Sequence, residues 1–476
     1  MTTPRRVIVV ELNEVPWRIL DDHIAAHPAS PSADILALSR QFTSVAPDHG
    51  HLSPWITWPT VHRGVDNDRH RITDLGQDTS GVDRRHPTYW SLAQRAGRDV
   101  GVFGPLHSHP LPDDVDRYAF WLPDTFAPDD AAHPRSLRPF QAFNLAMARA
   151  SARNVDTSID VRRAGAFLAL SPFLGLRPAT VASLVRQLAD ERRTPWTRIR
   201  RRSLQSVLAF DLFTHQLTRR RPDLAIVFTN HVASAMHRYW AATYPDDYDP
   251  ADYGFEPDWQ HRYAGEIDIA MGHADRLFAR LASFVAKDPR YLLVVTSSMG
   301  QAAAQGTPVR ELLLLRDADR LMARAGVGAG SWERRPAMDP MVSIRVDEAA
   351  QAGFGAFLDS LSVGGAPITH AADRAGLFSL EFGQADDAIG EVRVAGEAVD
   401  GSALGLERVQ IEDEAGSSAY HVPQGSLFVY DPQHPAGDSL RPEVSTTAIA
   451  PAILAALGVE PPAHHTPDPG FTLVPC

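Results

Sequence analysis

The sequence predicts a doubly wound α/β fold with a mostly parallel sheet, and three observations support this. The chain has 476 residues, enough for one large α/β domain with insertions or for two domains. Short apolar runs recur along it, and several are followed by polar loop residues and a helix-like stretch. Hydrophobic residues make up 44% and charged residues 22%, as in ordinary globular proteins. Strands alternating with helices place functional loops at the carboxyl ends of the strands.

The core elements are expected in chain order, beginning with a buried strand at residues 7–10 and an amphipathic helix from Trp17. A helix at 91–96 ends at Gly97, and a closing helix at 447–457 ends at Gly458. The further core strands are expected at residues 100–103, 224–228, 291–295 and 426–430.

Two segments interrupt this pattern and are predicted to be insertions. Residues 128–221 read as a helical cap, with helices at 164–176 and 179–188. Residues 336–416 read as a small α+β insertion, with glycine-punctuated segments at 377–382, 391–394 and 406–411. The α/β core is then made of residues 1–127, 222–335 and 417–476.

Composition limits the class of partner and the cellular setting. The net charge of -12 argues against a nucleic acid polymer, which requires a concentrated basic face, although a small anionic substrate remains compatible. Absence of an 18-residue apolar run argues against a membrane span, and the first residues lack a signal-peptide pattern, so we expect a cytoplasmic protein. The single cysteine, Cys476, excludes an intrachain disulfide. The sequence leaves the oligomeric state open.

Polar residues cluster in five segments, most of them beside predicted strands. Loops at the same edge of one sheet can converge on one pocket, so we expect these segments to meet. The segments are residues 11–14, 54–64, 230–240, 296–301 and 421–425.

The order of these segments resembles the alkaline phosphatase superfamily, most closely its type I phosphodiesterase/nucleotide pyrophosphatase branch. Leu12-Asn13-Glu14 stands where the family has a strand followed by Leu-Asp-Gly, and Thr57-Trp58-Pro59 matches its nucleophile turn. The family's Asp-x3-His motif falls on Ala233 and His237, and its Ser-Asp-His-Gly motif falls on residues 297–300. His421 matches its late histidine. The resemblance covers most of the chain outside the two insertions and implies hydrolysis or transfer of a phosphate, phosphodiester or sulfuryl ester.

The metal ligands that the resemblance implies have lost every carboxylate. One family metal would be held at Ala233, His237 and His421, and the other at Asn13, Thr57, Ser298 and Met299. Two divalent ions about 4 Å apart repel strongly without nearby carboxylates, so we expect no dinuclear centre.

Three interpretations of the remaining residues stay open. In the first, His237 and His421 bind a single divalent cation such as Zn or Mn, with Glu14, Glu11 or His231 as a third ligand. In the second, the histidines form hydrogen bonds in a polar pocket that binds nothing. The third is metal-free catalysis.

Metal-free catalysis assigns a role to each residue. Thr57 is then the nucleophile, His237 or His421 takes its proton, and Asn13 orients the substrate. The other residues expected to contact substrate are Arg63, Arg238, Glu14, Ser298 and His62.

Two other function classes remain beside the hydrolase or transferase. The missing carboxylates also fit a non-catalytic binding or scaffold protein on a phosphatase-like fold. An enzyme of changed chemistry, a metal-free transferase or lyase, would use the same pocket.

Overall fold

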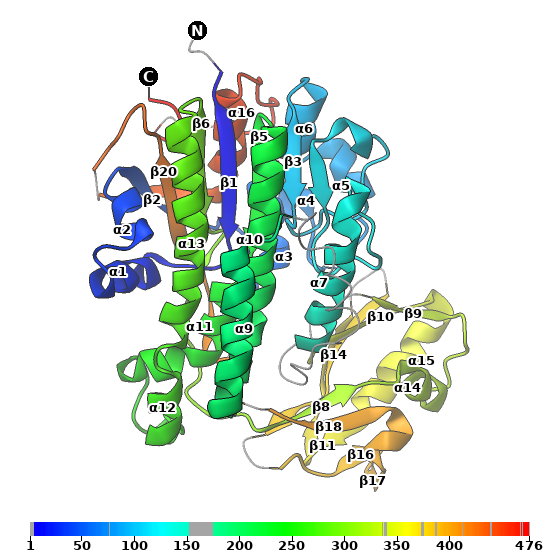
Figure 1. Ribbon diagram of the computed structural model, residues 1–476. Coiled ribbons are helices and arrows are strands. Elements are labelled where there is room, and N and C mark those ends of the chain that lie inside the picture. The colour runs from blue at the N-terminus through cyan, green and yellow to red at the C-terminus, as the bar shows by residue number, and fades with distance from the viewer. Residues whose placement is uncertain are drawn as a thin grey trace.

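The computed structural model describes residues 4–475 except 76, 152–174, 336, 338–339, 373–375, 386–387, 412, 438–439, 467 and 469, and it leaves undescribed the side chains of 149–151. A large sheet flanked by helices makes up most of the molecule, and a smaller α+β part lies at one end (Figure 1). Part of the expected helix at 164–176 falls on 164–174, outside the described residues.

The large sheet has eight strands in the order β21-β2-β20-β6-β1-β5-β3-β4. Within it β20 alone runs antiparallel to its neighbours, β2 and β6, and the other pairs are parallel. The bounds are β1 Arg6–Leu12, β2 Ser39–Val45, β3 Val100–Phe103, β4 Phe120–Leu122, β5 Leu224–Thr229, β6 Tyr291–Thr296, β20 Gln424–Tyr430 and β21 Glu443–Ser445.

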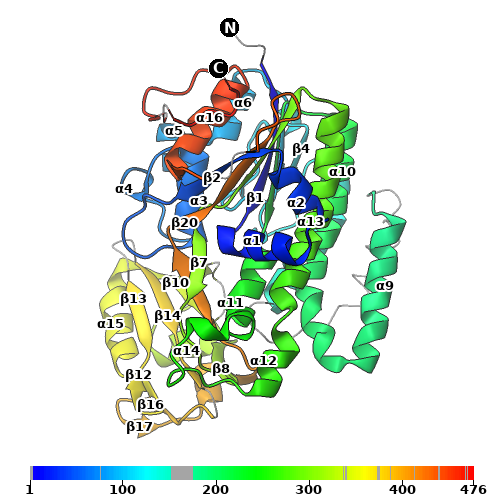
Figure 2. The ribbon, with the colours of Figure 1, turned by 90° about the vertical axis from the view of Figure 1, so that its left-hand side faces the viewer.

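Helices cover both faces of this sheet because the side chains of its buried strands alternate between two hydrophobic cores. Along β1, Ile8 and Val10 join one core, and Val7 and Val9 join the other. The first face carries α1 Trp17–Ala26, α2 Pro31–Leu36, α10 Arg201–Arg220, α11 His231–Thr243 and α13 Glu266–Lys287. The second face carries α3 Pro54–Arg63, α6 Tyr89–Arg95 and α16 Ile449–Ala456, and Figure 2 shows the two layers on either side of the sheet.

These observations confirm the predicted fold class, a doubly wound and mostly parallel α/β sheet. Each of the five predicted core strands is present, and each observed strand includes all the residues predicted for it. Runs of apolar residues predict these strands well because strands at the centre of such a sheet are buried on both faces. Among the described residues outside the smaller part, the remaining α-helices are α4 Asn67–His70, α5 Ser80–Arg85, α7 Arg138–Ser151, α9 Pro178–Arg193 and α12 Pro257–Tyr263.

The smaller α+β part has a hydrophobic core of its own, which runs from Leu313 to Leu406. It begins with β8, ahead of residue 336, and the domain division itself stays a prediction. Its elements are β8 Glu311–Leu315, α14 Ala318–Arg324, β9 Trp332–Arg335, β10 Val342–Val346, α15 Glu348–Asp359, β11 Leu361–Val363, β12 Ala366–Pro367, β13 Thr369–Ala372, β14 Leu377–Glu381, β15 Gln384–Ala385, β16 Val392–Val394, β17 Glu397–Ala398 and β18 Leu406–Gln410.

A short antiparallel pair, β7 Gly300–Ala303 and β19 Ala419–Val422, lies beside the large sheet. β7 follows β6 along the chain, and β19 leads into β20. Their pairing therefore brings together two of the polar segments, residues 296–301 and 421–425. No described helix has the length and apolar character needed to cross a membrane.

Candidate functional site

The site forms where β1 ends. Leu12 is the last residue of β1, and Glu14 follows with a φ of 60°, a left-handed conformation that a residue with a side chain rarely adopts. The Glu14 side chain is only 2% exposed. A buried carboxylate on strained backbone must be held by its surroundings, and such positions concentrate at functional sites.

Two histidines from distant segments converge on this carboxylate. His237 lies on α11, and its Nε2 is 3.0 Å from Glu14 Oε2. His421 lies on β19, and its Nε2 is 3.3 Å from the same oxygen. The His237 side chain is 27% exposed and that of His421 is 8% exposed, so the cluster opens to solvent on the side of His237.

The hydrogen bonds of the two Nδ1 atoms determine the protonation of the His237 and His421 rings. Nδ1 of His237 lies 2.7 Å from the carbonyl oxygen of Ala419, and Nδ1 of His421 lies 2.8 Å from that of Leu52. A carbonyl oxygen only accepts, so each Nδ1 carries a proton and donates it. Each Nε2 therefore faces Glu14 either as a lone pair or as the second N–H of an imidazolium.

Two amide side chains hold the Glu14 carboxylate in place. Asn13 Nδ2 donates to Glu14 Oε1 at 2.7 Å and to Asn230 Oδ1 at 2.7 Å. Gln301 Nε2 donates to Glu14 Oε2, while the buried Oε1 of Gln301 has no hydrogen-bond partner among the described groups. The amide of Asn13 thus orients Glu14, and the substrate-orienting role expected of Asn13 stays a prediction.

The charges of the cluster shift its pKa values. Burial by itself raises the pKa of Glu14, but the positive charges of His421 and His237 and their hydrogen bonds outweigh it, so this pKa lies well below the usual range. Burial lowers the pKa of His421, but the Glu14 carboxylate outweighs burial and the net pKa is raised. The cluster therefore keeps a charged carboxylate at neutral pH.

These three residues fit one divalent cation. Their ligand atoms, one each from Glu14, His237 and His421, all lie within 4.8 Å of one another. Two imidazoles and one carboxylate, each imidazole fixed through its other nitrogen, are the donor set of an open mononuclear site. The unpartnered Gln301 Oε1 adds a neutral oxygen beside it.

The other predicted third ligands lie elsewhere. Glu11 pairs with Nε2 of His62 at 2.9 Å, and both side chains are buried. His231 Nε2 donates to the carbonyl oxygen of Ala270 at 3.1 Å, and burial lowers the pKa of His231 to about 3. Neither residue is placed to join His237 and His421.

The positions of the second metal that the resemblance implies offer no comparable ligands. Its positions are all neutral side chains, and they are all buried: Asn13, Thr57, Ser298 and Met299. Asn13 already uses its oxygen to accept from Trp58 Nε1 at 2.7 Å. These four residues offer no charged ligand for a second cation, and the absence of a dinuclear centre stays a prediction.

Thr57 lies in the early part of α3 rather than in an open turn. Its side chain is fully buried, and its Oγ1 lies 3.2 Å from the carbonyl oxygen of Ser53 and 2.8 Å from Ser298 Oγ. Among the described contacts, neither His237 nor His421 bonds to this hydroxyl. The structure thus joins Thr57 to Ser298, and it joins His237 and His421 to Glu14, which also accepts from Asn13.

Two predicted substrate contacts on α3 are not in the cluster. Arg63 is 2% exposed, pairs with Asp83 at 2.8 Å and donates to the carbonyl oxygen of His86 at 2.6 Å. His62 is paired with Glu11 and packs against Trp90. His62 and Arg63 stand five and six residues after Thr57. At about 3.6 residues per turn, their side chains therefore point in other directions from α3 than that of Thr57.

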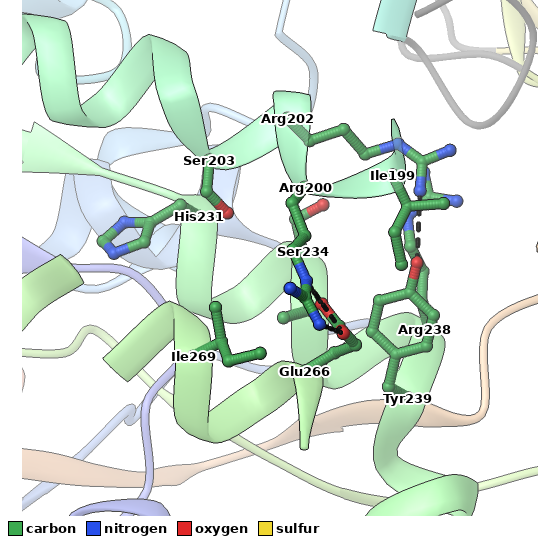
Figure 3. A pocket seen from close by; sticks show the side chains of 11 residues that line it. Ile199, Arg200, Arg202, Ser203, His231, Ser234, Arg238, Tyr239, Glu266 and Ile269 are labelled. Carbon is green, nitrogen blue, oxygen red and sulfur yellow. Dashed lines mark hydrogen bonds and ion pairs between the residues drawn. The ribbon is translucent and has the colours of Figure 1, made fainter. Parts of the chain in front are cut away.

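Arg238 lies on another face of α11 from His237, because neighbouring helix positions differ by about 100°. It lines a small hollow with Arg200, Arg202 and Glu266, seen from close by in Figure 3. Arg200 pairs with Glu266 at 2.7 Å, and Arg202 pairs with buried Asp413 at 2.7 Å. Asp413 also lies 3.6 Å from Arg238, so this hollow is a network of ion pairs apart from Glu14.

Sequence reasoning missed the contributions of Gln301 and Tyr420. Gln301 is the cross-strand partner of His421 in the β7–β19 pair, a register that no local pattern reveals. Tyr420 is 39% exposed, and its hydroxyl lies 3.2 Å from His51 Nε2. In the sequence, Tyr420 is indicated only by its position directly before His421.

Comparison with known proteins gives structural likeness only. No protein-family model matches the chain, and no curated protein matches its sequence. The structure is similar to murine ectonucleotide pyrophosphatase/phosphodiesterase 5, with a TM-score of 0.44, 10% identity, and 97% of this chain and 98% of that chain covered. It is also similar to phosphonoacetate hydrolase from Sinorhizobium meliloti 1021 in complex with phosphonoformate, with a TM-score of 0.41, 16% identity and 96% of each chain covered.

A third similar structure is wild-type alkaline phosphatase PafA, with a TM-score of 0.45, 12% identity, and 98% of this chain and 99% of that chain covered. By their names, these three proteins are a phosphodiesterase, a phosphonate hydrolase and a phosphatase.

Proposed function

We propose that this protein hydrolyses or transfers a phosphate, phosphodiester or sulfuryl ester at a mononuclear site formed by Glu14, His237 and His421. The observation that carries the proposal is the convergence of two Nε2 atoms on one buried carboxylate oxygen, at 3.0 and 3.3 Å. Each imidazole is fixed through Nδ1 by a backbone carbonyl, which leaves Nε2 available as a ligand.

A divalent cation such as Zn or Mn bound there would supply a Lewis acid for the anionic ester oxygen. The chain supplies the positioning. Asn13 and Gln301 keep the Glu14 carboxylate oriented, and Ser298 holds the Thr57 hydroxyl. We assign Thr57 the role of nucleophile, which requires its hydroxyl to turn from the Ser53 carbonyl toward the ester. The Thr57 oxygen then bonds to phosphorus or sulfur as the bond to the ester oxygen breaks, and its proton goes to that leaving oxygen.

The substrate is proposed to be a small anionic ester that enters beside His237. That imidazole is the most exposed member of the cluster, and its ring lies 6.2 Å from the ring of Tyr420. The net charge of -12 disfavours a nucleic acid polymer as the substrate. We retain the expectation that the protein acts in the cytoplasm.

A second candidate function follows from the complete burial of Thr57. A hydroxyl that is buried and bonded to Ser53 and Ser298 also fits a protein that binds an anionic ester without cleaving it. Binding of an ester without turnover distinguishes this candidate from the first.

The test combines elemental analysis with activity assays. The natural protein is expected to retain one equivalent of a divalent metal more than the Glu14→Gln protein does, and to cleave an aryl phosphodiester or monoester. Glu14→Gln keeps the shape of the side chain but removes the charge, so it should lower metal affinity and reduce turnover about 100-fold or more. His49→Gln, which alters an exposed histidine outside the cluster, is the matched control and should change neither.

Full turnover in metal-free protein would overturn the mononuclear site. If the natural protein binds an ester but does not turn it over with any divalent metal tried, the second candidate function is established instead.

A further inference from the structure

A second cluster of histidine and aspartate side chains lies away from Glu14, between α1 and α13. His23 is on α1, and His27 is the residue that caps its carboxyl end, so the two lie one turn apart on the same face. Asp268 and Asp275 are separated by about two turns on the facing side of α13. Figures 1 and 2 both show α1 beside α13.

The four side chains meet at short distances. His23 Nδ1 lies 2.6 Å from Asp268 Oδ1, and His27 Nε2 lies 2.8 Å from Asp268 Oδ2. One ligand atom each from His23, His27 and Asp268 can be chosen so that all lie within 4.8 Å of one another. A tetrahedral zinc ion places neighbouring ligand atoms about 3.3 Å apart, so small side-chain movements bring these three into its reach.

Asp275 gives His23 the orientation that a ligand needs. Its Oδ2 lies 2.7 Å from His23 Nε2, and its Oδ1 accepts from the backbone N–H of Ser32 at 2.9 Å and from the Ser32 hydroxyl. A buried carboxylate that takes the N–H of one ring nitrogen directs the lone pair of the other nitrogen outward, as in carboxylate–histidine–zinc arrangements. In His23 that outward nitrogen is Nδ1, which faces Asp268.

The exposure of the cluster allows a cation to enter and to keep water as a further ligand. The His23 side chain is 4% exposed, whereas those of His27 and Asp268 are 48% and 45% exposed. A rigid inner ligand with two outer ligands open to solvent makes a surface site that needs no rearrangement of the core. Since the ligands come from both helices, a bound cation would also tie α1 to α13.

We propose that His23, His27 and Asp268 bind one divalent transition-metal cation of the zinc class, with Asp275 as the positioning residue for His23. The cation takes the place of the proton between His23 Nδ1 and Asp268, and the displaced proton goes to solvent. The site is separate from the Glu14 cluster, and the proposal does not depend on the function of that cluster.

The test uses full-length protein carrying Glu14→Gln, so that zinc at the other cluster does not obscure the result. After chelator treatment, titration with Zn²⁺ alone is expected to show one bound equivalent per chain. Adding His27→Gln, a change at an exposed helix end that the fold should tolerate, is expected to weaken this binding about 10-fold or more. Adding His49→Gln instead, at another exposed histidine, should leave it unchanged.

Co²⁺ provides a readout that is independent of affinity. The Glu14→Gln protein should develop visible absorption with Co²⁺, and the Glu14→Gln/His27→Gln protein should not. If the Glu14→Gln protein binds no Zn²⁺, or if His27→Gln leaves its Zn²⁺ binding unchanged, the cluster is only a network of ion pairs. A protein with His237→Gln in place of Glu14→Gln repeats the test should the first variant fold poorly.

Discussion

His421 and Gln301 are cross-strand partners in the β19–β7 pair, and both side chains reach Oε2 of Glu14. One belongs to the strand before β20 and the other to the strand after β6, so sheet register alone brings an imidazole and an amide to the same carboxylate oxygen. The imidazole of His421 is suited to bind a cation, and the amide of Gln301 is suited to fix the Glu14 carboxylate that would bind the same cation.

Gln301→Leu is predicted to weaken cation binding at the Glu14 cluster about 10-fold, because Glu14 loses the amide that orients it. Competition between the protein and a chromophoric chelator for Zn²⁺ measures the dissociation constant, with His27→Gln added to every protein so that the His23 cluster contributes little. Gln384→Leu alters an exposed glutamine on β15 and serves as the control. Equal affinity in the two variants would show that Gln301 does not support the ligand set.

Thr57→Val is predicted to reduce turnover of an aryl phosphodiester about 1,000-fold or more, since it removes the nucleophilic oxygen and keeps the side-chain volume. Thr57→Ser retains the hydroxyl and is expected to keep measurable turnover. Metal content should match the natural protein in both variants because Thr57 is not in the Glu14 ligand set. Undiminished turnover in Thr57→Val would assign nucleophilic attack to another group.

Arg63→Met is predicted to lower stability and to leave activity per folded molecule unchanged. The substitution keeps an unbranched apolar stem, but it loses the ion pair of the buried Arg63 with half-exposed Asp83 and the hydrogen bond to the His86 carbonyl. The expected cost is about 1–3 kcal/mol. Thermal unfolding and steady-state kinetics separate the two effects. A large rise in KM with no change in melting temperature would return Arg63 to the substrate-binding residues.

Stability is predicted to fall as the pH drops below about 6.5, the pKa of a free histidine. Burial lowers the pKa of His231 to about 3, so the unfolded chain binds a proton between pH 6.5 and 3 that the folded protein does not. The stabilisation from the neutral His231 is thus complete above pH 6.5 and is lost on acidification, by up to about 1.4 kcal/mol per pH unit. Burial likewise lowers the pKa of His70 to about 3 and that of His107 to about 4.

Melting temperatures measured between pH 7.5 and 5 check this prediction in the natural protein and in His231→Gln. Glutamine retains a donor and an acceptor but does not titrate, so the variant should lose less stability over this range. His49→Gln, at an exposed position, should follow the natural protein. Identical slopes for His231→Gln and the natural protein would contradict the assigned role.

Much of the fold could be predicted from local pattern, because a strand buried on both faces must be apolar throughout. Residues 7–10 and 291–295 show such runs, and both form central strands of the large sheet. The polar residues that follow these strands mark the edge at which Glu14 lies. Side-chain direction was less predictable, as His237 and Arg238 are neighbours on α11 yet belong to different clusters.

The sequence by itself determined the core strands along the chain, the polar segments that follow them, and the neutral side chains at Asn13 and Ala233. These are properties of residue type and spacing, so they can be recognised without knowing how the side chains pack. Only the tertiary structure decided that the buried Glu14 carboxylate meets His237 and His421, and that Arg63 is buried away from them. Both outcomes depend on backbone conformation and helix phase, which long-range packing fixes and a single sequence does not display.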